Sequence, residues 1–127
     1  MNLGTVFVID CDSPYEVVTS PGTTIITPNN EFNHYGFNRD CQVTLTFGKR
    51  VIIVFEEFAL DTLHCHDWLE VHDGDNPDSD VIGERLCGDD IPSPIESSGN
   101  SMTLVFHSDQ YKYPSEKGFK IITNQGT

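Results

Sequence analysis

Short runs of β-branched and aromatic residues recur along this 127-residue chain between turn-forming clusters, and their spacing limits the possible folds more than any other feature. The candidate strands are Thr5–Ile9, Tyr15–Val18, Thr23–Ile26, Cys41–Phe47, Arg50–Phe58, Trp68–His72, Val81–Cys87, Ser101–His107 and Lys117–Thr123. Helical periodicity is weak throughout. Short strands in this number, without an internal repeat or an interdomain linker, predict an all-β sandwich or barrel.

The length of the chain limits the number of domains. A chain of 127 residues can build one hydrophobic core and is too short for two. We expect one domain over residues 1–127, with its core within residues 11–123 and with residues 1–10 as an N-terminal extension or an edge strand. The chain has no signal peptide and no apolar run long enough to cross a bilayer, so we expect a mature protein or an excised domain without membrane insertion.

Three of the candidate strands indicate which of their faces are buried. In Cys41–Phe47 and in Ser101–His107 apolar and polar residues alternate, which predicts one packed face and one face toward water. Val51–Phe55 is instead apolar without a break. Such a run predicts a central strand that is covered on both sides.

The charge balance restricts the class of partner. Twenty acidic residues stand against seven basic ones, which gives a formal net charge of −13. Nucleic-acid binding needs clustered Lys and Arg to neutralise phosphates, and this class of function is therefore excluded. Cations, basic peptides and basic proteins are the partners that such a surface favours.

The chain contains four cysteines, at positions 11, 41, 65 and 87, and no C-x-x-C pair. An even number of widely spaced cysteines in a short chain predicts two disulfides in an oxidising compartment rather than a zinc site or a redox motif. Three pairings are possible, and we favour the sequential one, Cys11–Cys41 and Cys65–Cys87. Each bridge would then contribute on the order of 3 kcal/mol to stability in the chain-entropy model.

The stretch Phe55–Gly74 concentrates the side chains that could carry chemistry. Within it Asp61 follows one candidate strand and Asp67 precedes the next, while Asp109 follows the strand Ser101–His107. If these strand ends meet at one edge of a sandwich, three carboxylates converge there, and like charges that close favour the binding of a cation. Oxygen ligands on loops are those that Ca²⁺ prefers, so the spacing indicates a calcium site. The alternative is that each Asp is a solvated turn residue.

Several short motifs also occur in a distinctive order and at distinctive spacings. They are Thr27–Asn29, Y-x-x-N-x-x-C at Tyr35–Cys41, F-x-x-F-x-L-D at Phe55–Asp61, Cys65, D-W-L-E-V at Asp67–Val71, D-G at Asp73–Gly74, C-G at Cys87–Gly88, F-x-S-D at Phe106–Asp109 and G-F at Gly118–Phe119. Each motif is weak alone. Together they cover nearly the whole chain from Cys11 to Thr123, and in this arrangement the chain resembles the CUB domain family.

The resemblance implies a two-sheet antiparallel β-sandwich of the jelly-roll type with the sequential disulfide pairing. CUB domains are extracellular modules for protein or carbohydrate recognition in complement and developmental proteases, endocytic receptors and seminal-fluid proteins. We therefore expect a secreted or extracellular recognition domain that is not an enzyme. In agreement, the sequence has no nucleophile elbow, no Gly-rich phosphate loop and no zinc-protease motif.

The calcium-binding subset of the family implies a set of ligands. By this resemblance Asp61, Asp67 and Asp109 hold Ca²⁺, and Tyr35 supports them. Two features depart from the family pattern, because Asp61 replaces the usual Glu and only His66 separates Asp67 from the preceding cysteine. The shorter loop either draws Asp61 inward and offsets its shorter side chain, or spoils the site.

In this family the ion often orients carboxylates that accept a Lys or Arg side chain from a protein partner. The resemblance therefore implies Asp61 and Asp109 as partner-binding residues, with Gln110 and Tyr111 beside them. The physical basis is a charge-assisted hydrogen bond to acids that the ion has already fixed in place.

Other functions fit parts of the sequence. His64 and His66 flank Cys65, but a zinc site needs free thiolates or a tetrahedral ligand set, which conflicts with a disulfide at this cysteine. A metal-independent carbohydrate-binding or self-associating structural domain is one alternative, and the regulatory part of a larger secreted protease is another. Calcium dependence of partner binding separates the first of these from a calcium-binding domain.

Overall fold

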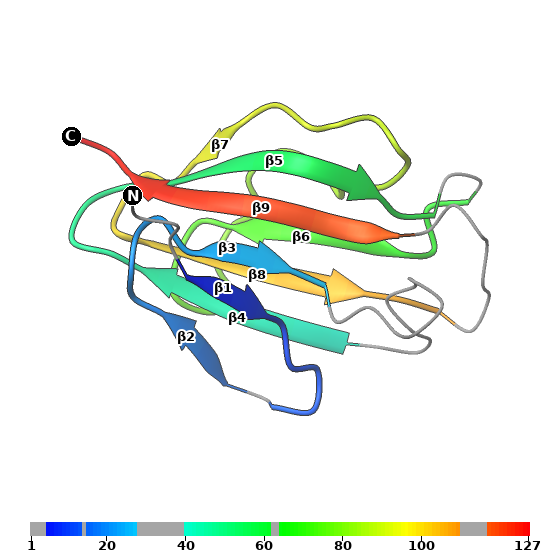
Figure 1. Ribbon diagram of the computed structural model, residues 1–127, viewed down its shortest axis with the longest axis horizontal. Coiled ribbons are helices and arrows are strands. Elements are labelled where there is room, and N and C mark those ends of the chain that lie inside the picture. The colour runs from blue at the N-terminus through cyan, green and yellow to red at the C-terminus, as the bar shows by residue number, and fades with distance from the viewer. Residues whose placement is uncertain (1–4, 14, 28–39, 62–63, 110–116) are drawn as a thin grey trace.

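The computed structural model describes residues 5–13, 15–27, 40–61, 64–109 and 117–127, and it folds them into two stacked β-sheets without a helix (Figure 1). The strands are β1 (Val6–Val8), β2 (Glu16–Val18), β3 (Thr24–Ile26), β4 (Asp40–Thr46), β5 (Val51–Ala59), β6 (Trp68–His72), β7 (Ile95–Glu96), β8 (Ser101–His107) and β9 (Gly118–Gln125). One sheet has the order β1-β3-β9-β5-β7 and the other β2-β4-β8-β6. The predicted all-β sandwich of two sheets is therefore confirmed.

Most strand pairs are antiparallel, but β1 pairs with β3 in parallel, and so does β2 with β4. Both parallel pairs lie at an edge of their sheet. Parallel neighbours need a crossover connection, and here each crossover runs through the opposite sheet. Between β1 and β3 the chain forms β2 in the opposite sheet, and between β2 and β4 it forms β3 in the opposite sheet.

The strand predicted at Val81–Cys87 is wrong. Ile82 donates its backbone N–H to Val71 of β6 (2.7 Å), and Leu86 exchanges two backbone hydrogen bonds with Leu69 (2.8 and 3.0 Å). Ile82 and Leu86 are therefore four residues apart, whereas their partners Val71 and Leu69 are only two apart. Gly83, which follows Ile82, has a φ of +73°. The segment bulges away from β6 and forms only isolated bridges. The short strand β7 was not predicted, because prolines directly precede it.

The core lies between the inner faces of the two sheets. The alternation predicted for β4 and β8 is confirmed, since their inward residues are buried: Val43, Leu45, Met102, Leu104 and Phe106. Phe106 on β8 meets Phe119 on β9 edge to face, with ring centroids 5.5 Å apart. This contact joins the two sheets, because the strands that carry it belong to different ones.

The outward faces of the same two strands are less exposed than we predicted. The hydroxyls of Thr44 and Thr103 lie 3.1 Å apart and are buried. Thr103 also donates a hydrogen bond to the carbonyl of Gly74 (2.9 Å). The loop after β6 therefore covers the middle of this outer face.

The prediction that β5 is covered on both sides is also wrong. Val51, Ile53 and Phe55 point into the core, whereas Val54 between them is 42% exposed. The outer face of the five-stranded sheet carries further exposed apolar side chains, Val6 and Val8 on β1 and Ile122 on β9. β5 has a neighbouring strand on each side, β9 and β7, but only one of its faces is packed against the other sheet.

This assignment of faces predicts different costs for two truncations. Leu104→Ala removes a side chain that is 1% exposed, and we expect the free energy of unfolding to fall by about 2–5 kcal/mol because a cavity remains between the sheets. Val54→Ala on the outer face of β5 should change it by less than about 1 kcal/mol. Urea unfolding of both variants measures the difference. Equal losses would contradict the assignment.

Candidate functional site

The three aspartates predicted as ligands come together at one end of the sandwich. β5 and β8 end at this end and β6 begins there (Figure 1). Asp61 follows the end of β5, Asp67 directly precedes β6, and Asp109 follows the end of β8. Since β5 belongs to one sheet and β6 and β8 to the other, the site lies where the two sheets meet.

Asp61 is buried, and two backbone N–H groups from the segment around Cys65 bind its carboxylate. One oxygen, Oδ1, accepts the backbone N–H of His64 (3.0 Å), and Oδ2 accepts that of His66 (2.8 Å). Cys65 between them has a φ of +55°, a left-handed conformation that is uncommon for a residue with a side chain. The tight loop therefore holds the carboxylate by both of its oxygens.

The same loop is held from a second side by the segment around Cys87. The structure joins Cys65 to Cys87, and it joins Cys11 to Cys41, which is the sequential pairing that we favoured. Gly88 donates its N–H to the carbonyl of Asp61 (3.1 Å), and its own carbonyl accepts the N–H of Leu60 (2.9 Å). Its φ of +87° explains why glycine follows the cysteine at this position.

Asp67 and Asp109 are linked to each other and to the loop. The carboxylate of Asp67 is buried, and its Oδ1 accepts the backbone N–H of Asp109 (2.7 Å). The Oδ2 of Asp109 lies 3.2 Å from Nδ1 of His66. One ligand atom from each of Asp61, His66 and Asp109 falls within 4.8 Å of the others.

The structure therefore adds one residue to the predicted set. His66 lies with Asp61 and Asp109, and Asp67 lies beside them through its bond to the backbone of Asp109. The signal that points to His66 is the single-residue spacing between Cys65 and Asp67. The other predicted residues, Tyr35, Gln110 and Tyr111, lie outside the described residues.

Arg85 and side chains of β6 form a network along this strand. Glu70 accepts a hydrogen bond from Nε of Arg85 (2.6 Å) and contacts Nε2 of His72 (3.1 Å). The Arg85 guanidinium lies 4.1 Å above the ring of Trp68, the residue that follows Asp67. Burial raises the pKa of Glu70, but the hydrogen bonds and charges of Arg85 and His72 together outweigh burial, and the pKa lies below its usual value of 4.5.

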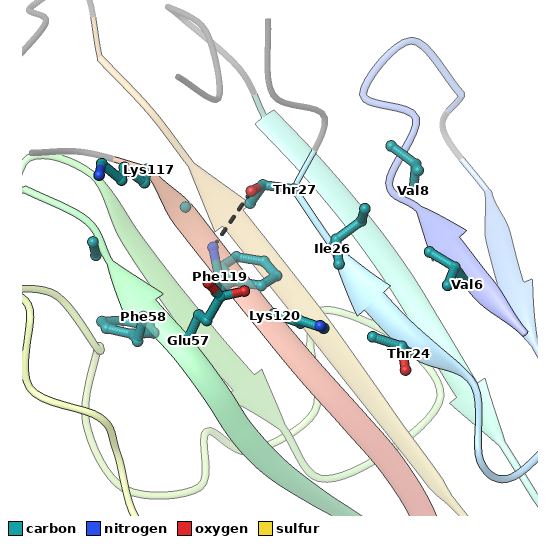
Figure 2. Close-up of a pocket in the computed structure, with 12 residues that line it drawn as sticks. Val6, Val8, Thr24, Ile26, Thr27, Glu57, Phe58, Lys117, Phe119 and Lys120 are labelled. Carbon is teal, nitrogen blue, oxygen red and sulfur yellow. Dashed lines mark hydrogen bonds between the residues drawn. The ribbon is translucent and has the colours of Figure 1, made fainter. Parts of the chain in front are cut away.

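A separate hollow of about 880 Å³ lies on the outer face of the five-stranded sheet (Figure 2). The residues that line it include Val6, Val8, Ile26, Phe119, Lys117 and Lys120. None of the three predicted aspartates lines it. The hollow is thus distinct from the carboxylate corner.

Comparison with known proteins identifies the family. The sequence matches the CUB domain family over residues 11–122. The chain therefore belongs to this family. The resemblance inferred from the sequence motifs is confirmed.

This CUB domain is similar to parts of larger proteins. Human inactive serine protease PAMR1 is 33% identical to it over 107 residues, which are 81% of this chain and 14% of that protein. Among solved structures, the MASP-1 CUB2 domain bound to Ca²⁺ has a TM-score of 0.71 at 25% identity and covers 86% of this chain and 96% of that chain. The full extracellular region of zebrafish Gpr126/Adgrg6 has a TM-score of 0.70 at 25% identity, over 88% of this chain and 14% of that chain.

A CUB domain is a non-catalytic module. In the described residues no helix is long and apolar enough to cross a membrane.

The contacts of Glu70 predict a dependence of stability on pH. A carboxyl whose folded pKa is lowered stabilises the fold above its unfolded pKa, near 4.5, and this contribution is lost as pH falls through the folded value. Glu70→Gln should therefore be less stable than the parent near neutral pH, with a difference that shrinks in acid. Urea unfolding between about pH 7 and pH 3 measures it. Glu84→Gln is the control for the loss of one exposed negative charge, and a constant difference across this range would contradict the prediction.

Proposed function

We propose that this CUB domain binds Ca²⁺ through Asp61, Asp67 and Asp109 and uses the ordered corner to recognise a protein partner. The supporting observation is the convergence of these carboxylates from three strand ends, with ligand atoms of Asp61 and Asp109 within 4.8 Å of each other. The similar MASP-1 CUB2 domain is described as bound to Ca²⁺, which favours this ion for a corner built mainly from oxygen donors.

The residues present fit such an ion in charge as well as in geometry. Asp61 and Asp67 are 2% and 1% exposed, and Asp109 lies beside them. Burying carboxylates close together is costly unless hydrogen bonds or a positive charge compensate them. Backbone N–H groups of the loop supply part of this compensation, and a divalent cation would supply more. Bound there, Ca²⁺ would fix the ends of β5 and β8 against the start of β6.

The proposed partner carries exposed Lys or Arg side chains. The side chain of Asp109 is 20% exposed and is thus the carboxylate of the corner that a partner reaches most directly. Asp61 would contribute through an oxygen shared with the ion, and Gln110 and Tyr111 would border the contact. The net charge of −13 would speed the encounter with a basic surface.

We place the domain outside the cell, as one unit over residues 1–127. Its two disulfides support an oxidising compartment, and a similar fold occurs in the extracellular region of Gpr126/Adgrg6. The chain spans 14% of PAMR1, so a role as one module of a longer protein is part of this proposal.

The ion should raise the stability of the folded domain. At about 5 mM free Ca²⁺, a site with the affinity usual in extracellular modules adds about 1–2 kcal/mol to the free energy of unfolding, which raises the melting temperature by several degrees. Thermal unfolding of the oxidised protein in chelator, in Ca²⁺ and in Mg²⁺ measures this. Asp109→Ala should remove the Ca²⁺ shift, whereas Asp78→Asn, an exposed acid on a loop away from the corner, should keep it. A melting temperature that does not change with Ca²⁺ would contradict the proposed site.

Partner recognition should depend on the same ion. We expect the domain to bind a polylysine surface more strongly in Ca²⁺ than in Mg²⁺, because only Ca²⁺ orders the corner. Acetylated polylysine controls for the ammonium groups. Asp78→Asn carries the same charge change as Asp109→Asn, so it separates specific binding from attraction to net charge. Binding that responds to neither Ca²⁺ nor Asp109→Asn would exclude this face as the recognition site.

A further inference from the structure

His66 introduces a nitrogen donor into a corner that is otherwise built from carboxylates. Its Nδ1 lies 3.2 Å from Oδ2 of Asp109, and both atoms fall within 4.8 Å of an oxygen of Asp61. The position follows from the short loop, in which the left-handed Cys65 and the bond from the His66 N–H to Asp61 fix the backbone that leads into His66.

This donor set differs chemically from that of a calcium site. Ca²⁺ takes oxygen ligands, and an imidazole nitrogen is a poor ligand for it. Zn²⁺ binds imidazole nitrogen at about 2.0–2.1 Å and carboxylate oxygen at about 2.0–2.2 Å. Two ligand atoms of a tetrahedral Zn²⁺ then lie roughly 3.3 Å apart. The 3.2 Å between His66 Nδ1 and Asp109 Oδ2 matches this edge, so both ligands could bind the ion with little movement.

Asp61 is suited to provide the third ligand. Each carboxylate oxygen can accept two bonds, so an oxygen that takes a backbone N–H can also bind a metal ion. The N–H groups of His64 and His66 hold this carboxylate in a fixed orientation. Water would complete the tetrahedron, as is usual where a protein supplies three zinc ligands.

We propose that this corner is also a binding site for Zn²⁺, with His66, Asp61 and Asp109 as its ligands, in competition with Ca²⁺. The two ions share Asp61 and Asp109, and to that extent the inference rests on the proposed function. They differ in one ligand each, because Zn²⁺ uses the nitrogen of His66 and Ca²⁺ uses the buried carboxylate of Asp67. The ligands are the histidine and two acids, so the site leaves the Cys65–Cys87 disulfide intact.

Two neighbouring histidines make the test specific. His64 is exposed and its ring stacks on that of His66 at 5.3 Å, but it is not part of the three-residue cluster. His64→Ala keeps the backbone N–H that Asp61 accepts and removes only the ring, so it is the matched control for His66→Ala. The side chain of His66 is 55% exposed, so its removal should leave the fold intact, and His66→Gln provides a second variant of similar size.

The experiment is isothermal titration of the oxidised protein and these variants with Zn²⁺, and separately with Ca²⁺. We expect one Zn²⁺ per chain in the parent, a loss of affinity of at least about tenfold in His66→Ala and His66→Gln, and no change in His64→Ala. Ca²⁺ affinity should be the same in all four proteins. Adding Ca²⁺ should weaken Zn²⁺ binding in the parent.

The outcomes separate this inference from the calcium proposal. Zn²⁺ binding that is equal in the parent and in both His66 variants, or absent from the parent, overturns the inference whatever Ca²⁺ does. Zn²⁺ binding that requires His66 in a protein that does not bind Ca²⁺ supports the zinc ligands, but it overturns both the competition and the proposed function. In a protein that binds both ions, Zn²⁺ binding that Ca²⁺ does not weaken overturns the shared site.

Discussion

The packing of the two sheets against each other is the constraint on which the rest of the structure depends. Buried side chains of β4 and β8 from one sheet meet those of β5 and β9 from the other, and Phe106 against Phe119 lies within this contact. Burial of apolar surface is the main favourable term in folding. It also aligns the strands, so that Asp109 reaches the end of the sandwich where Asp61 and Asp67 lie, although it is 42 residues from Asp67 in sequence. The carboxylate corner is a consequence of this core.

The loop after β5 fixes the orientation of the Asp61 carboxylate within this corner. A left-handed residue other than glycine costs on the order of 1–3 kcal/mol, and Cys65 adopts this conformation. Its disulfide to Cys87 spans a sequence separation of 22, a loop for which the chain-entropy model gives about 3 kcal/mol. The hydrogen bonds of His64 and His66 to Asp61 add to this. The strain is thus offset locally, and Asp61 is oriented before any ligand arrives, which lowers the cost of binding.

Sequence alone predicted those parts of the structure that depend on local patterns. Alternation of apolar and polar residues predicted the inner faces of β4 and β8. The position of the aspartates at strand ends predicted that their carboxylates meet at one corner. The strand prediction for Val81–Cys87 was wrong because this segment bulges at Gly83. The bulge depends on how the segment pairs with β6, and composition does not reveal that pairing. His66 was not assigned to the cluster because its direction follows from the backbone of Cys65, a conformation that local sequence disfavours. The exposure of Val54 depends on what covers the sheet, and an apolar run carries no information about that.

The short side chain of Asp61 bears on which ion the corner favours. Its carboxylate lies against the loop backbone, where it accepts two N–H groups, so an ion that binds Asp61 must lie close to this backbone. Ca²⁺ needs six to eight oxygens at about 2.3–2.6 Å, and backbone carbonyls or water must supply those that the aspartates do not. Zn²⁺ needs four ligands at shorter distances, and His66 with two aspartates supplies three. The two ions would therefore use different neighbours of Asp109. Ca²⁺ would use Asp67, which accepts the backbone N–H of Asp109, and Zn²⁺ would use His66, which faces the Asp109 carboxylate. The short loop places the imidazole of His66 beside Asp109, so the corner offers a nitrogen donor in addition to its acids.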